Sequence, residues 1–352
     1  MMRRISAIIA PLLVVVLGIE VAARIGDLES YDRLLPVVLV SSQDPIFGPG
    51  EYEYALTYGL VLEAAVAAGD AETADLASAW LQDDQLPAGW GMGWTWDPYS
   101  DGSMTPAGTP FAITTAIAID SLLEAGIDAE QADRIGRILV RWAREAWTDG
   151  YFWYSLAPQD AIDTPNGNGM LAGAAATFLA EHEDVLTDAD AAFLRERVER
   201  SLAHLASDHD ASLRWSYSAR QAVVNDLANH IYILWGAERA RDAGFEIGWS
   251  REEAIDSVDS YGGVYPSDMV LTPDMEARKG SQWQTSGTGA ALAFSSRWGG
   301  DIRRWSNAVC ETLKVSPRIP RFDAHALLGM ALVGLCECPN RPDPPKSPIR
   351  TC

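Results

Sequence analysis

Asp226 and His230 are the residues whose types and spacing point most directly to chemistry. They lie four residues apart in Gln221–Ala243, an apolar run that we expect to form one long helix, so their side chains share a face. A carboxylate that holds an imidazole makes an acid or base suited to neutral pH. The alternative is a buried pair that only fixes helix packing, because unpaired polar groups inside an apolar helix cost free energy.

Three further carboxylates lie in loops that precede apolar segments. Asp97 and Asp101 belong to a glycine-rich, aromatic loop between Pro87 and Pro110, and Asp163 begins the sequence Asp-Thr-Pro-Asn-Gly-Asn-Gly. A pair of carboxylates can protonate and attack a glycosidic bond, and a single one can also bind calcium. The alternative role for each is in a turn or a helix cap, where Asp is common.

The same loops are rich in aromatic, amide and basic side chains that would suit a sugar-binding cleft. Aromatic rings have flat apolar faces that can stack on sugar rings, although core packing is the alternative for any single ring. The candidate substrate-binding residues are Trp90, Trp94, Trp96, Tyr99, Trp153, Tyr154, Asn166, Trp215, Tyr217, Arg220, Asn225, Gln282 and Trp283. Tyr151, Tyr154 and Tyr217 also keep lyase or epimerase chemistry open, since a tyrosine can remove a proton beside a uronate carboxylate.

The elements that must position these loops repeat along the chain. An apolar segment alternates with an amphipathic one, and the apolar segments begin near Tyr52, Phe111, Gly169, Gln221, Thr285 and Phe322. Helices that are apolar all round must be buried inside helices with one wet face. We therefore expect an all-α protein with an inner ring of about six helices, an outer ring of about six, and no strand of useful length. The segment Ser30–Gln43 would supply the last outer helix.

This pattern resembles the α/α-toroid, or six-hairpin, carbohydrate-active enzymes: glycoside hydrolases, polysaccharide lyases and the C-terminal domain of glucuronyl C5-epimerases. The resemblance covers about residues 45–337 and rests on helix alternation, without a family-specific catalytic motif. It implies an active site at the end of the ring where the loops enter the inner helices. Helix N-termini with free N–H groups would face that site. Terpene cyclases share the fold, but their QW repeats and DDxxD motif are not apparent.

Composition limits the partners. The chain has 352 residues, with 49 acidic and 27 basic side chains and a net charge of −22, which argues against nucleic acid and anionic lipid as partners. The five His are scattered and no dinucleotide or phosphate-binding motif occurs in a suitable context, so we expect no metal and no cofactor. The expected partner is an oligo- or polysaccharide.

Residues 1–23 have the pattern of an export signal or an N-terminal membrane anchor. Arg3 and Arg4 precede the uncharged run Ile5–Ile19, which is short for a membrane span. We expect residues 24–338 to form one toroid domain, periplasmic or extracellular, attached to the membrane if the segment is retained. Residues 339–352 form a proline-rich tail. An oxidising compartment would allow the four cysteines to form two disulfides, and the alternative is that they are buried free thiols. They are Cys310, Cys336, Cys338 and Cys352.

The sequence thus predicts an exported carbohydrate-active enzyme, with glycosidic hydrolysis favoured over uronate lyase or epimerase chemistry. A non-catalytic glycan-binding or polysaccharide-assembly factor with the same toroid and cleft is the main alternative. A terpenoid-cyclase-like enzyme is a further alternative, and it would need a mostly apolar cavity.

Overall fold

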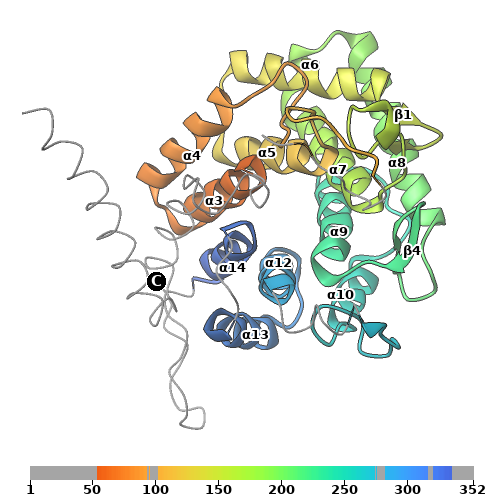
Figure 1. Cartoon of the computed structure of the whole chain (residues 1–352). Coiled ribbons are helices and arrows are strands. Elements are labelled where there is room, and N and C mark those ends of the chain that lie inside the picture. The colour runs from red at the N-terminus through yellow and green to blue at the C-terminus, as the bar shows by residue number, and fades with distance from the viewer. Residues whose placement is uncertain are drawn as a thin grey trace, which may run out of the picture.

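Six helices form a closed inner ring (Figure 1). The structure is a computed structural model that describes residues 54–92, 95, 102–273, 275, 282–315 and 320–334. Each inner helix packs against the next and the last packs against the first. In ring order they are α3 (Tyr54–Ala68), α5 (Ala112–Ala125), α7 (Pro165–His182), α9 (Leu227–Asp242), α12 (Gln282–Trp298) and α14 (Pro320–Leu332).

A second set of helices lies outside this ring in Figure 1. In the described part of the chain they are α4 (Ala71–Asp83), α6 (Ala129–Glu145), α8 (Asp188–Ser207), α10 (Arg251–Asp259) and α13 (Ile302–Val315). The predicted all-α architecture of two concentric rings is confirmed. The outer helix expected at Ser30–Gln43, the signal or anchor at 1–23 and the tail at 339–352 lie outside the described residues.

Burial explains which helices are inside. Every residue of α5 from Ala112 to Leu123 is buried, whereas α6 buries one face and exposes arginines and glutamates on the other. Small residues let the inner helices approach closely. A Cβ added to Gly173 of α7 would lie 2.3 Å from the carbonyl oxygen of Gly236 of α9, so the two backbones meet directly there.

Two short hairpins depart from the predicted helical pattern. β1 (Trp147–Thr148) pairs with β2 (Tyr151–Phe152), and β3 (Ser216–Ser218) pairs with β4 (Gln221–Val224), both antiparallel. The prediction that a helix begins at Gln221 is therefore wrong, because Gln-Ala-Val-Val forms β4 and α9 begins at Leu227. A short apolar run does not distinguish a strand from a buried helix.

The other boundaries lie close to those expected. α8 spans Asp188–Ser207, while α7 begins earlier than the expected start near Gly169, at Pro165, a residue that suits the first turn of a helix. Asn166 therefore lies inside α7 and not in the loop before it. Cys310, on α13, is disulfide-bonded, which agrees with one of the two states expected for the cysteines.

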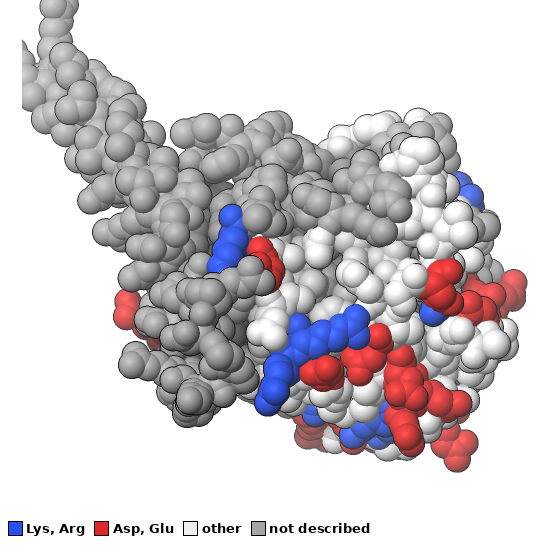
Figure 2. Space-filling view, turned by 90° about the horizontal axis from the view of Figure 1, so that it is seen from below, with Lys and Arg blue, Asp and Glu red and all other residues white. Residues whose placement is uncertain are grey.

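The surface in the described part of the chain mixes charges of both signs. On the face shown in Figure 2, the Lys and Arg side chains of the described residues lie beside Asp and Glu side chains. Within the described residues, no helix combines the length and the apolarity that crossing a membrane requires.

Candidate active site

Polar side chains occupy the early turns of all the inner helices. Hydrogen bonds join the early turns of neighbouring helices: Asn166 of α7 donates to Asn229 of α9 at 2.6 Å, and Ser286 of α12 lies 3.3 Å from Nδ1 of His325 on α14. The N-terminal ends of these helices therefore gather at one end of the ring. The polar residues there are Thr57, Thr114, Asn166, Asn229, Thr285, Ser286, Asp323 and His325, and all except Asn229 are buried.

Tyr232 and His325 connect two inner helices across the ring. The hydroxyl of Tyr232 on α9 is hydrogen-bonded to Nε2 of His325 on α14. Because α12 stands between α9 and α14 in the ring, this bond runs through the ring's interior. Ser286 of α12 holds the other ring nitrogen. The three side chains form a buried Ser–His–Tyr group whose phenol and imidazole can exchange a proton.

Asp226 caps the N-terminus of α9. Its Oδ1 accepts from the backbone N–H of Asn229 at 3.0 Å, and its Oδ2 accepts from the Asn229 side-chain amide at 2.9 Å. The carboxylate is 6 % exposed, and Asn229 links it to Asn166 on α7. The free N–H groups of a helix start favour the ionised form of such a carboxylate. Asp226 is thus a buried, hydrogen-bonded carboxyl group at the end of the ring where the polar residues gather.

His230 does not pair with the Asp226 side chain, so the predicted pair is wrong. Nε2 of His230 lies 2.8 Å from the hydroxyl of Ser257 on the outer helix α10, and the imidazole stacks on Tyr261. With Asp226 at the N-cap, only the backbone N–H of His230 reaches residue 226, through the first helical hydrogen bond. Burial lowers the pKa of His230 to about 3, so the imidazole is neutral and part of the packing between α9 and α10.

Asp163 lies at the rim of the ring, beside an outer helix. Its Oδ2 lies 2.7 Å from Nε2 of His204 near the end of α8, and this hydrogen bond raises the pKa of His204. Tyr151 of β2 lies against the same imidazole, with the two ring centres 5.5 Å apart. A carboxylate–imidazole pair of the kind predicted for Asp226 and His230 therefore occurs instead between Asp163 and His204.

The C-terminal end of the inner ring is closed by ion pairs. Arg239 of α9 reaches Asp120 of α5 at 3.0 Å, and Arg297 of α12 reaches Glu63 of α3 at 3.3 Å. Both arginines also bind Glu124 of α5. Three carboxylates face two guanidinium groups, and burial, together with Asp120, raises the pKa of Glu63 to about 7. The network is therefore close to neutral when Glu63 keeps its proton.

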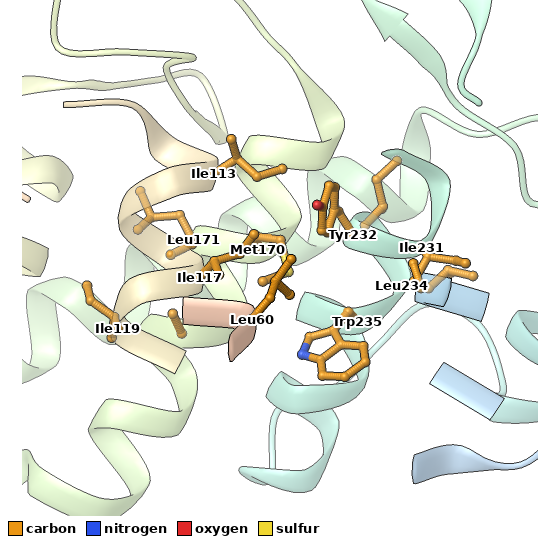
Figure 3. Close-up of a cluster of buried hydrophobic side chains, with 14 of the residues drawn as sticks. Leu60, Ile113, Ile117, Ile119, Met170, Leu171, Ile231, Tyr232, Leu234 and Trp235 are labelled. Carbon is orange, nitrogen blue, oxygen red and sulfur yellow. The ribbon is translucent and has the colours of Figure 1, made fainter. Parts of the chain in front are cut away.

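A cavity of about 20 Å³ lies between these two ends, lined by Glu63, Trp235, Tyr232 and His325 and by apolar side chains of the inner helices. Figure 3 shows Tyr232 and Trp235 in this interior beside Leu60, Ile117 and Met170. A space of this size holds about one water molecule. Within the described residues, the N-terminal end of the ring differs from the C-terminal end, where the charged groups are paired with one another.

The remaining candidates divide between the core and the surface. Trp90 and Trp215 are fully buried and donate to the backbone carbonyls of Leu81 and Leu205, so they pack the core instead of lining a cleft. Tyr154 and Asn225 are also buried, while Trp153, Tyr217, Arg220 and Trp283 are at least partly exposed. The candidates outside the described residues, or described without their side chains, are Trp94, Trp96, Asp97, Tyr99, Asp101 and Gln282.

Known structures share this arrangement. A reducing-end-xylose releasing exo-oligoxylanase complexed with xylobiose aligns with a TM-score of 0.50 and 13% identity, over 80% of this chain and 81% of that chain. The chain is an α/α toroid. An alpha-amylase from Clostridium perfringens aligns with a TM-score of 0.51 and 12% identity, over 79% of this chain and 85% of that chain. No family model and no curated protein matches, so the likeness to these glycoside hydrolases is one of fold.

Tyr232 and Ser286 are not among the candidates that the sequence predicts. Tyr232 lies in an apolar helix, where a tyrosine is expected in the core, and Ser286 lies among small residues that indicate close packing. One feature of the sequence could have identified them. Both side chains, like that of His325, lie in the early turns of apolar helices, where a buried polar group needs a hydrogen-bond partner.

Proposed function

We propose that this protein is a carbohydrate-active enzyme that binds an oligo- or polysaccharide at the N-terminal end of the inner ring and hydrolyses a glycosidic bond there. The observation that carries this proposal is the presence of two buried carboxylates, Asp226 at the start of α9 and Asp323 in the first turn of α14, at the N-terminal ends of inner helices of an α/α toroid. The toroid fold of two glycoside hydrolases supports the same class of substrate.

Asp226 is the first candidate for a catalytic carboxylate in this proposal. Hydrolysis of a glycosidic bond needs one carboxyl group as acid and a second as base or nucleophile. Asp226 caps a helix start, where free N–H groups stabilise a carboxylate anion, and this position suits a base or nucleophile. Asp323, which is 1% exposed and lies inside the first turn of α14, is the candidate for the second carboxyl group. Asp97 and Asp101 stay as predicted alternatives.

The Tyr232–His325 pair favours lyase or epimerase chemistry as a second candidate function. Both reactions remove a proton beside a carboxylate, and a tyrosine hydrogen-bonded to an imidazole can carry that proton. The interior cavity of about 20 Å³ has room for about one water molecule, so it is far smaller than the apolar chamber that a terpenoid cyclase needs.

We also propose that the protein acts outside the cytoplasm. The basic start and apolar run of residues 1–23 support export, and the disulfide at Cys310 suits an oxidising compartment. The segment is either a cleaved export signal or a retained membrane anchor.

The proposal is tested by incubating the purified protein with acidic and neutral polysaccharides and following three signals in parallel. New reducing ends without unsaturated uronates are the expected result for a hydrolase. Absorbance from unsaturated uronates, or solvent deuterium at sugar carbons, would replace hydrolysis with the lyase or epimerase alternative. Binding with none of the three signals would overturn the enzyme proposal in favour of a glycan-binding or assembly factor.

A further inference from the structure

Three potential metal ligands converge at the rim of the toroid, outside the interior of the inner ring. Asp163 comes from the loop before α7, His204 from the last turn of α8, and Asp208 is the cap residue directly after α8. One ligand atom from each residue lies within 4.8 Å of the other two. His204 and Asp208 are four residues apart, so the helix presents both on one side.

Asp163 provides a second and separate sign that a ligand belongs here. The residue is only 9% exposed, and its carboxylate points at His204 through Oδ2. Its other oxygen, Oδ1, is buried and accepts no hydrogen bond. A buried carboxylate oxygen without a donor is costly, and a bound cation would remove that cost. The backbone holds Asp163 in place, since its carbonyl oxygen accepts from the N–H of Ala219 at 3.1 Å.

We propose that Asp163, His204 and Asp208 bind a divalent transition metal ion such as Zn²⁺. An imidazole nitrogen with two carboxylate oxygens suits zinc and its neighbours better than calcium, which takes oxygen ligands only. Three protein ligands leave a coordination position for water. The ion would clamp the loop that leads into inner helix α7 to outer helix α8. This inference is independent of the proposed function, because it concerns metal binding and stability only.

The test uses the full-length protein after treatment with a chelator and dialysis. Zn²⁺ binding is measured by calorimetry, and the melting temperature is recorded with and without Zn²⁺. We expect one ion per chain and a higher melting temperature with zinc. His204→Gln and Asp208→Asn should each weaken zinc binding at least about tenfold. Asp208 is exposed, so its variant should fold even if the His204 variant does not.

His209→Gln is the matched control, because His209 lies next to Asp208 but outside the cluster. Its zinc affinity should equal that of the unchanged protein. No stoichiometric zinc binding, or binding that Asp208→Asn leaves unchanged, would overturn the proposal.

Discussion

The hydroxyl of Tyr232 meets the imidazole of His325 inside the ring, although α12 stands between the two helices that carry them. Ser286 of α12 lies on the other side of the same imidazole. Opposite this group, Arg239 and Arg297 make equivalent cross-ring contacts with carboxylates. Polar bonds thus cross both ends of the ring, while the middle is apolar. The two ends differ because, at the C-terminal end, Arg239 and Arg297 neutralise the charge of the carboxylates.

Replacing Tyr232 with Phe tests the Ser–His–Tyr group. If this pair transfers a proton, Tyr232→Phe should lower kcat by about 10²–10⁴-fold. Its stability should fall by about 1–3 kcal/mol, because Nε2 of His325 loses a buried partner. The control is Tyr261→Phe, which removes a buried hydroxyl bond to the carbonyl oxygen of Asn225. Equal kcat values for the two variants would assign Tyr232 to packing alone.

His230 should govern stability but not turnover. Its pKa falls from 6.5 in the unfolded chain to about 3 in the folded protein, so the unfolded state binds the extra proton between these values. The stability that depends on a neutral His230 is therefore fully present above pH 6.5 and is lost as the pH falls towards 3. In denaturant titrations, His230→Asn should lose less stability than the unchanged protein over that range. A shift of the pH–rate profile in His230→Asn, absent from His209→Asn, would contradict this role.

Glu63 should make stability depend on pH in the opposite direction from His230. Its pKa rises from 4.5 to about 7 on folding, so the folded state binds the extra proton and stability declines as the pH rises from 4.5 to 7. Glu63→Gln should remove that decline, which amounts to on the order of 1–3 kcal/mol. Unfolding by denaturant at several pH values measures it. Glu130→Gln, an exposed change on α6, should keep the slope, and a slope unchanged in Glu63→Gln would refute the assignment.

The two rings of helices were predictable from the sequence because the burial of a helix determines the pattern of its apolar residues. The residues of α5 are apolar nearly all round and those of α6 are not, so the amino-acid pattern alone separates inner from outer helices. The start of α9 was not predictable in the same way. Gln221–Val224 is too short a run for periodicity to identify as a strand, and the cap at Asp226 depends on that strand ending first.

The site was less predictable than the fold, because its contacts join residues far apart in the sequence. The spacing of Asp226 and His230 predicted that they share one helical face. In the structure, Asp226 is the N-cap of α9 and His230 packs against Ser257 on α10. The pairing of Tyr232 with His325 depends on the order of helices in the ring. Single-sequence patterns report local periodicity, and they do not report which distant helix faces a given side chain.

Asp226→Asn, compared with Asp128→Asn, tests most directly whether the N-terminal end of the inner ring is the active centre. Both residues are helix N-caps, Asp226 on inner helix α9 and Asp128 on outer helix α6, and Asn caps a helix about as well as Asp. On the polysaccharide that the unchanged protein turns over, we expect Asp226→Asn to lower kcat by about 10²–10⁴-fold with little change in melting temperature. Asp128→Asn should leave both unchanged. Full turnover by Asp226→Asn would contradict the account and leave Asp226 as a helix cap only.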